Sequence, residues 1–167
     1  VLPDSFTLTA KMTLQASAGE NYWGSIAFCT QKDIWNDTDL SDLSEGYHVL
    51  LRENGNLQLY RRDGRTFTLL NEITTSAWTQ GQTANIEIVV NASQITVKRD
   101  SSSFTVNDTK YRNGYLHLGR YVSGVLFNDI YINWVFIPKI GDRAKLIVVD
   151  DKVGYEKEVI TNGRYKR

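Results

Sequence analysis

Alternate positions of the stretch 46–70 carry aromatic, guanidinium, imidazole and amide side chains. Apolar residues recur at the positions between them, as expected of strands with one buried face. An aromatic ring can stack on a sugar ring, and planar polar groups can hydrogen-bond to sugar hydroxyls. The side chains predicted to share the outer face are His48, Leu50, Arg52, Asn56, Gln58, Tyr60, Thr66 and Thr68. The alternative is a merely solvated sheet face, where threonine and tyrosine serve strand formation.

Two glycine-bearing turns decide which of these side chains share a face. Glu53-Asn54-Gly55 and Arg62-Asp63-Gly64 both fit three-residue loops with glycine in the left-handed conformation. This register makes one face entirely apolar. Its predicted cross-strand pairs are Leu51 with Leu57, Val49 with Leu59, Leu59 with Phe67 and Leu57 with Leu69. A two-residue Asn-Gly turn would instead move Val49 and Leu51 to the opposite face, so the three-residue loops are favoured.

The segment 31–45 loses the strand period and carries acidic residues around Trp35. Long irregular connections on a compact domain are more often functional than decorative. The Trp35 indole could anchor the loop, or it could stand exposed as a stacking platform for a sugar ring. The carboxylates of Asp37 and Asp39 with Asp42, or with Asp33, could supply oxygen ligands to calcium, although an acidic solvated loop is the commoner explanation.

Residue types suited to catalysis occur singly rather than in sets. Retaining glycosidases need two carboxylates about 5–5.5 Å apart, whereas Glu87 and Asp129 each stand alone in an expected strand. The sequence contains no GxSxG, HExxH or CxxC motif and no phosphate-cradling glycine loop. Cys29 lies in an apolar run and is interpreted as a buried, inert thiol. These patterns predict a protein that is not an enzyme.

The composition restricts the class of partner. The chain has 167 residues with 19 basic and 19 acidic side chains, so its formal net charge is zero. This balance argues against a nucleic acid or an anionic membrane as partner, because both require a basic excess. No segment approaches the run of about 18 apolar residues that a membrane span needs, so no membrane insertion is expected.

The remaining pattern predicts the elements that position these side chains. Further strands are expected at 5–14, 22–30, 84–90, 95–98, 104–106, 115–119 and 125–137. Trp78, just before a strand, is expected to plug the edge of the core. About ten short strands separated by turns predict an all-β fold, an antiparallel two-sheet β-sandwich of the jelly-roll kind. Residues 1–137 would form this domain, and 138–167 a hairpin that either extends it or begins a following module.

The order of these features resembles a known family. The segments are DSFTLTAKMTL, WGSIAF, GYHVLLRENGNLQLYRRDGRTFTLL, ANIEIVV, NASQITVKRD and YLHLGRYVSGVLFNDIYI. Over 4–137 the chain resembles the concanavalin A-like superfamily, in particular its laminin-G-like and bacterial carbohydrate-binding-module branches. The resemblance implies that FNDIYI pairs beside the opening strand, with Asn128 and Asp129 near a bulge. It differs at 99–103, where family members often carry a short Asp-Gly or Asn-Gly turn.

The resemblance also implies glycan binding by a non-catalytic module attached to an enzyme, adhesin or phage tail. The expected ligand is a cell-surface or cell-wall polysaccharide, and the expected location is extracellular, on a cell surface or a virion. The proposed contacts are Trp35 and Tyr60 for stacking, His48, Arg52 and Gln58 for hydroxyl groups, and Tyr121 at the rim. Two alternatives are a structural or assembly domain of a phage tail or surface fibre, self-associating through 138–167, and a glycoside hydrolase. Calcium is the one cofactor considered.

Overall fold

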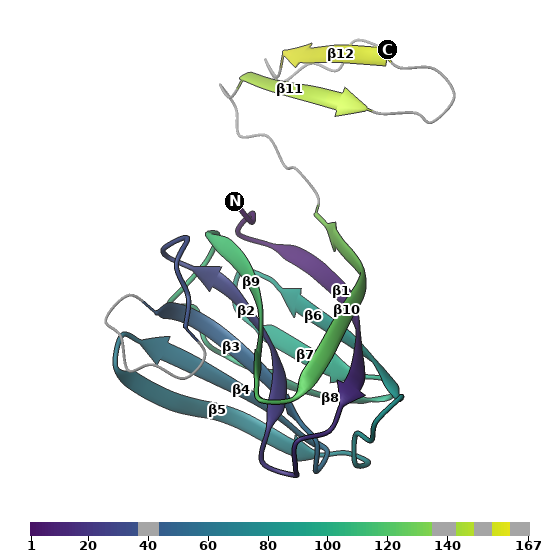
Figure 1. Cartoon of the computed structure of the whole chain (residues 1–167). Helices are drawn as coiled ribbons and strands as arrows, with labels where there is room; N and C mark the ends of the chain where they lie inside the picture. Colours follow the sequence, from purple (N-terminus) through teal and green to yellow (C-terminus); the bar gives the residue numbers. More distant parts are fainter. Residues whose placement is uncertain (37–43, 135–142, 149–154, 161–167) are drawn as a thin grey trace. The chain divides into compact units, whose positions relative to one another are not determined.

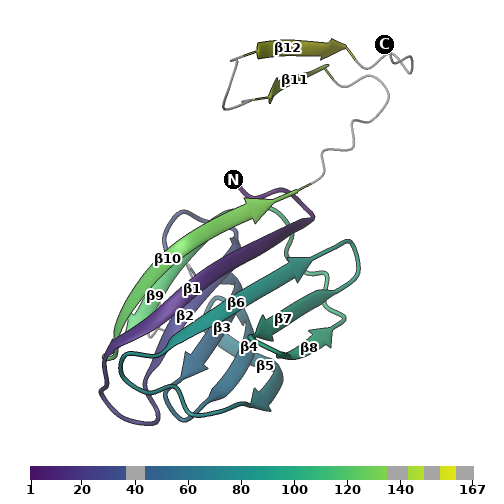
Figure 2. The ribbon, with the colours of Figure 1, turned by 90° about the vertical axis from the view of Figure 1, so that its right-hand side faces the viewer.

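The chain forms two compact units, Val1–Trp134 and Val135–Arg167, in a computed structural model. The structure describes residues 1–36 and 44–134 in full, together with the backbone of strands at 143–148 and 155–160. The first unit consists of two five-stranded antiparallel sheets that pack face to face (Figures 1 and 2). This arrangement confirms the predicted all-β sandwich. No helix in the described part of the chain is long and apolar enough to cross a membrane.

The two sheets interleave strands from distant parts of the sequence. The front sheet has the order β5-β4-β3-β2-β9, and the back sheet has the order β10-β1-β6-β7-β8. The front strands are β2 (Trp23–Thr30), β3 (Glu45–Arg52), β4 (Asn56–Asp63), β5 (Thr66–Thr74) and β9 (Tyr115–Tyr121). The back strands are β1 (Phe6–Ala16), β6 (Thr83–Val90), β7 (Ile95–Arg99), β8 (Ser102–Val106) and β10 (Gly124–Asn133).

The core lies between the sheets and follows the alternation in the sequence. In β1 the side chains from Phe6 to Leu14 alternate between buried and partly exposed, which puts every second residue into the core. Trp78 is buried as predicted, and its indole N–H donates to the Gln82 carbonyl at 3.0 Å. Cys29 is also fully buried, and this burial raises the pKa of its thiol to about 12. The predicted burial of this thiol is therefore confirmed.

The first predicted turn gives the expected register between β3 and β4. Val49 pairs with Leu59 and Leu51 with Leu57, and all four side chains are buried in the core. Gly55 in this turn has φ +94°, and a Cβ there would lie 2.4 Å from the Thr75 carbonyl oxygen. Only glycine fits both the conformation and the space.

The second predicted register, between β4 and β5, is wrong. Phe67 pairs with Arg62 and Leu69 pairs with Tyr60, so both apolar side chains stand on the outer face, 38% and 46% exposed. The pairs predicted for them, Leu59 with Phe67 and Leu57 with Leu69, do not form. Thr66 and Thr68, expected on the outer face, have the opposite orientation because they pair with Asp63 and Arg61.

Two features produce this difference. Asp63 pairs directly with Thr66, so the loop holds the two residues Gly64 and Arg65 instead of three. Further along β5, the register shifts between the partners of Leu59 and Tyr60, which leaves one extra residue in β5. Such a β-bulge reverses the inside–outside alternation, and Leu70 and Ile73 consequently pack on the core.

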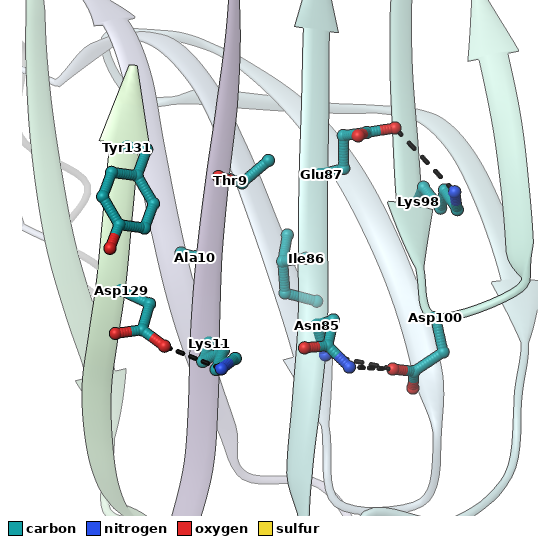
Figure 3. A pocket seen from close by; sticks show the side chains of 10 residues that line it. All are labelled: Thr9, Ala10, Lys11, Asn85, Ile86, Glu87, Lys98, Asp100, Asp129 and Tyr131. Atoms are coloured by element: carbon teal, nitrogen blue, oxygen red, sulfur yellow. Dashed lines mark hydrogen bonds and ion pairs between the residues drawn. The ribbon is translucent and has the colours of Figure 1, made fainter. Parts of the chain in front are cut away.

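A second β-bulge interrupts the pairing of β10 with β1, at the edge of the back sheet. Tyr131 pairs with Thr9 but Asn128 pairs with Lys11, and Asp129 between them has φ +49°. Figure 3 shows Asp129 and Tyr131 on β10, with Lys11 on the neighbouring β1. The FNDIYI segment therefore lies beside the opening strand with a bulge near Asn128 and Asp129, as the family resemblance implied.

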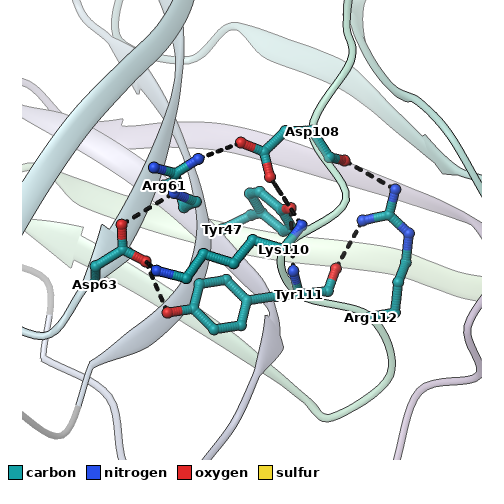
Figure 4. A network of polar contacts seen from close by, with 7 residues as sticks. All are labelled: Tyr47, Arg61, Asp63, Asp108, Lys110, Tyr111 and Arg112. Atoms are coloured by element: carbon teal, nitrogen blue, oxygen red, sulfur yellow. Dashed lines mark hydrogen bonds and ion pairs between the residues drawn. The ribbon is translucent and has the colours of Figure 1, made fainter.

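A network of polar side chains fixes the loop 107–114 to the front sheet (Figure 4). The carboxylate of Asp63 accepts from the Tyr111 hydroxyl at 2.7 Å and from Arg61 Nε at 3.0 Å, and it lies 2.7 Å from Lys110 Nζ. Asp108 accepts hydrogen bonds from Tyr47 and Arg61. Burial alone would raise the pKa of Asp63, but its hydrogen bonds outweigh burial and lower that pKa to about 2.

The second unit contains an antiparallel hairpin. Its strands are β11 (Arg143–Val148) and β12 (Tyr155–Ile160), and Arg143 pairs with Ile160 at the open end. The unit boundary after Trp134 falls three residues before the predicted one. Whether the hairpin extends the sandwich domain or begins a following module stays a prediction.

Candidate functional site

Trp35 lies on the outer face of the front sheet. Its ring meets the His48 ring edge-on at 5.1 Å between centroids and stacks on the His117 ring at 6.2 Å, with 21° between the planes. The guanidinium of the fully buried Arg62 lies between two rings, 5.0 Å from Trp35 and 4.1 Å from Phe67. Trp35 is thus anchored by cation–π and aromatic contacts, yet it remains partly exposed.

A groove of about 330 Å³ opens between Trp35 and strand β9. We call it the front groove, and the residues that line it are Trp35, Asn36, His117, Leu118, Gly119, Arg120 and Tyr121. Gly119 pairs with Ser25 across the sheet, and His117 pairs with Ala27. The small side chains of Ser25 and Ala27, together with Gly119, leave space above this part of the sheet. The rings of Trp35 and Tyr121 line that space.

Tyr121 belongs to a row of aromatic side chains. Its ring lies 4.7 Å from the Trp23 ring and 5.4 Å from the Tyr22 ring, and Tyr121 is 40% exposed. The guanidinium of Arg52 lies over Trp23 at 4.8 Å. Tyr22 and Trp23 were missed by the sequence analysis. The alternation of Trp23, Ser25 and Ala27 along β2 was the signal that places Trp23 on this face.

The structure separates the other predicted contacts from the front groove. Arg52 Nε donates to Gln58 Oε1 at 2.7 Å, and Gln58 Nε2 in turn donates to Glu72. Tyr60 packs edge-on against Phe67 at 6.5 Å, toward strand β5. His48 and Gln58 are only 1% and 7% exposed.

Of the six predicted contacts, the structure therefore brings Trp35 and Tyr121 into one groove. His48 lies behind Trp35, and Arg52 adjoins the aromatic row through Trp23. Gln58 and Tyr60 lie further along the sheet.

A buried carboxylate holds the loops beside the aromatic row. Glu53 is 6% exposed and accepts hydrogen bonds from the hydroxyls of Ser17 and Ser123, at 2.5 and 2.6 Å. The backbone N–H groups of Ala18 and Gly19 also donate to it. Burial would raise the pKa of Glu53, but these hydrogen bonds lower it below its ordinary value. The sequence analysis assigned Glu53 only to a turn, because its partners lie about 35 and 70 positions away.

The proposed calcium ligands Asp37, Asp39 and Asp42 lie outside the described residues. Among the described residues, no group of three or more histidine, cysteine, aspartate or glutamate side chains could hold a metal ion. Calcium binding by the acidic loop stays a prediction.

Comparisons with known proteins give matches in structure only. The sequence matches no family model and no curated protein. The carbohydrate-binding module CBM66 from Bacillus subtilis is similar with a TM-score of 0.65 and 12% identity, over 78% of this chain and 76% of that one. The Ca²⁺-bound exoplasmic/lumenal domain of VIP36 is similar with a TM-score of 0.62 and 8% identity, over 83% of this chain and 72% of that one. Sheep galectin-11, in complex with glycerol, has a TM-score of 0.54 and 13% identity, over 79% of this chain and 92% of that one.

These likenesses concern the fold. All three solved structures are concanavalin A-like β-sandwiches, so the predicted architecture is confirmed. The sequence identities lie far below those that transfer a function, which must be argued from the site.

Proposed function

We propose that this domain is a non-catalytic carbohydrate-binding module that binds a cell-surface or cell-wall polysaccharide in the front groove. The observation that carries the proposal is that two partly exposed rings, Trp35 and Tyr121, line one groove of about 330 Å³. The module would act outside the cell, on a cell surface or virion, as part of a larger enzyme, adhesin or phage tail protein.

The chemistry of the front groove suits a sugar. Aromatic faces attract the C–H groups of a sugar ring, and the imidazole, amide and guanidinium groups of the lining can hydrogen-bond to hydroxyls. The volume lies within the range of about 300–1,000 Å³ typical of small-molecule sites. The rings are held in place before a ligand arrives, because Arg62 clamps Trp35 and Trp23 supports Tyr121. Preorganised side chains lose less entropy on binding.

The experiment replaces the exposed ring on β9. We expect Tyr121→Ala to weaken glycan binding about tenfold, equivalent to about 1.4 kcal/mol, as for an aromatic residue at the centre of a binding site. Binding would be measured by calorimetry with a polysaccharide that the wild type retains from a panel of glucans, mannans, galactans and fructans. The melting temperature should change little, since Tyr121 is 40% exposed.

Tyr115→Ala is the matched control. Tyr115 lies on the same strand, is 39% exposed, and does not line the front groove. Equal affinity of Tyr121→Ala and Tyr115→Ala would contradict the proposal. Arg52→Ala and Tyr60→Ala then measure how far the binding face reaches along β3 and β4. A loss of folding in these two variants would mark both residues as structural.

A further inference from the structure

The outer face of the back sheet carries a second hollow, of about 320 Å³. We call it the back hollow. Its wall along β10 is formed by Asp129 and Tyr131, and Lys11 projects from β1 (Figure 3). Glu87 from β6 and Lys98 from β7 stand on the far side. The front groove and the back hollow thus lie on opposite faces of the sandwich and share no residue.

The bulge in β10 shapes this hollow. Asp129 has φ +49°, a conformation that side chains other than glycine, asparagine and aspartate rarely adopt. Bulges aim side chains in directions that regular pairing does not allow, and they are frequent beside functional sites. Here Asp129 and Tyr131 both project on the hollow side of β10. Tyr131 is 60% exposed.

Two pairs of opposite charge lie in the back hollow. Lys11 Nζ lies 2.7 Å from Asp129 Oδ2, and Lys98 Nζ lies 4.0 Å from Glu87 Oε1. The third carboxylate, Asp100, accepts from Asn85 Nδ2 at 2.9 Å and lies 3.7 Å from Arg99 Nε, a group outside the hollow. Neutralised pairs attract neither an anion nor a cation strongly. An ammonium group has three donors and a carboxylate about four acceptor sites, so each pair retains capacity for hydroxyl groups.

We propose that the back hollow is a second carbohydrate-binding site, in which Tyr131 stacks on a sugar ring and the Lys11–Asp129 pair hydrogen-bonds to hydroxyls. The class of ligand rests on the proposed function, whereas the residues are independent of the front groove. A domain with sites on opposite faces holds two glycan segments at once. On a long polysaccharide this bivalency raises avidity and crosslinks chains.

The test counts ligands on the full 167-residue chain. The probe is a tetrasaccharide cut from a polysaccharide that the wild type retains. We expect calorimetry to give two tetrasaccharides for each wild-type chain. Tyr131→Ala and Tyr121→Ala should each weaken one of the two sites about tenfold and leave the other site weakened less than about threefold. The wild type should also make a solution of the intact polysaccharide turbid, and both variants should lose this crosslinking. Tyr115→Ala is again the control and should behave as the wild type.

A second variant tests the polar half of the back hollow without removing the ring. Asp129→Asn removes the charge that pairs with Lys11 and keeps a residue type that adopts the positive φ of this position. Both side chains of the pair are about half exposed, so folding should be retained. We expect a loss of affinity of about tenfold or more at one of the two sites, the size typical of a hydrogen bond to a charged group.

The number of bound tetrasaccharides and the effect of each variant distinguish failure of the back-hollow proposal from failure of the front-groove proposal. The result that overturns the back-hollow proposal is one tetrasaccharide for each wild-type chain, bound about tenfold more weakly by Tyr121→Ala and with unchanged affinity by Tyr131→Ala. This result leaves the front-groove proposal intact. If instead Tyr131→Ala weakens the single site and Tyr121→Ala does not, the front-groove proposal is overturned and the back-hollow proposal is supported. A wild-type chain that binds no glycan in the panel overturns both. A wild-type dimer that Tyr131→Ala converts to monomers also overturns the proposal, because the hollow would then be an interface between copies.

Discussion

The Asp63 carboxylate makes the stability of the fold depend on pH. Its hydrogen bonds from Lys110, Tyr111 and Arg61 exist fully only when it is ionised, which is why its pKa falls from 3.8 to about 2. A group with a lowered folded pKa stabilises the protein above its unfolded pKa. Asp63 therefore stabilises the fold above about pH 4, and this stability is lost as the pH falls toward 2.

Replacing Asp63 by asparagine should remove that contribution. We expect Asp63→Asn to lower the free energy of unfolding at pH 7 by on the order of 2 kcal/mol, since each pKa unit corresponds to about 1.4 kcal/mol. The deficit relative to the wild type should shrink between pH 4 and pH 2. Urea denaturation across this pH range measures it. Glu20→Gln, at an exposed position, is the control. A deficit independent of pH would contradict the assigned role.

At the residue scale, the two rings of the front groove were easier to predict from the sequence than the side chains that hold Trp35 in place. Trp35 and Tyr121 were predicted because an aromatic residue in a polar loop stands out. The interactions that hold Trp35, with Arg62 and the two histidines, join segments that no local pattern connects. Glu53 was missed as an anchor for the same reason, because its donors come from two other loops.

At the scale of elements, Glu53 joins the loops that flank the aromatic row. We expect Glu53→Gln to destabilise the domain by about 1–3 kcal/mol, because an amide cannot accept all four hydrogen bonds and leaves buried donors unsatisfied. Glycan affinity should fall as well, since Tyr22 and Tyr121 lie next to the loosened loops. Denaturant unfolding and calorimetry measure the two effects. An unfolding free energy equal to that of Glu20→Gln would refute the anchoring role.

The registers of the strands show where periodicity suffices and where it fails. The β3–β4 pairing was predictable, because the turn at Gly55 and the apolar alternation agree on one arrangement. The β4–β5 pairing was not. Phe67 and Leu69 have the apolar character of core residues, and no residue type around this bulge in β5 distinguishes it from a regular strand.

At the scale of the whole molecule, the strand count and turn spacing were enough to predict a sandwich. Each strand carries its own alternation, so its existence does not depend on which neighbour it pairs with. The order of strands in each sheet is a different matter. β1 lies between β6 and β10, and β2 lies beside β9. Composition and period do not specify these pairings, whose partners are up to 126 positions apart, as for Thr7 and Asn133.

The division of the chain gives a prediction at this scale. A chain ending at Trp134 retains both five-stranded sheets, so we expect it to fold, with a melting temperature within a few degrees of the full chain. It should also bind glycan with unchanged affinity. Thermal denaturation and calorimetry test both expectations. Light scattering with and without residues 135–167 tests the alternative of an assembly domain, which requires self-association of the full chain only.

Cys29 gives this protein a built-in reporter. It is the only cysteine in the chain, it is fully buried in the sandwich, and its thiol has a pKa of about 12. A thiol-specific reagent can therefore react only during moments when the two sheets separate. If reclosing outpaces the chemistry, the labelling rate in native buffer measures the free energy of that opening. Every variant described above can then be ranked for stability without added denaturant, with or without a bound glycan.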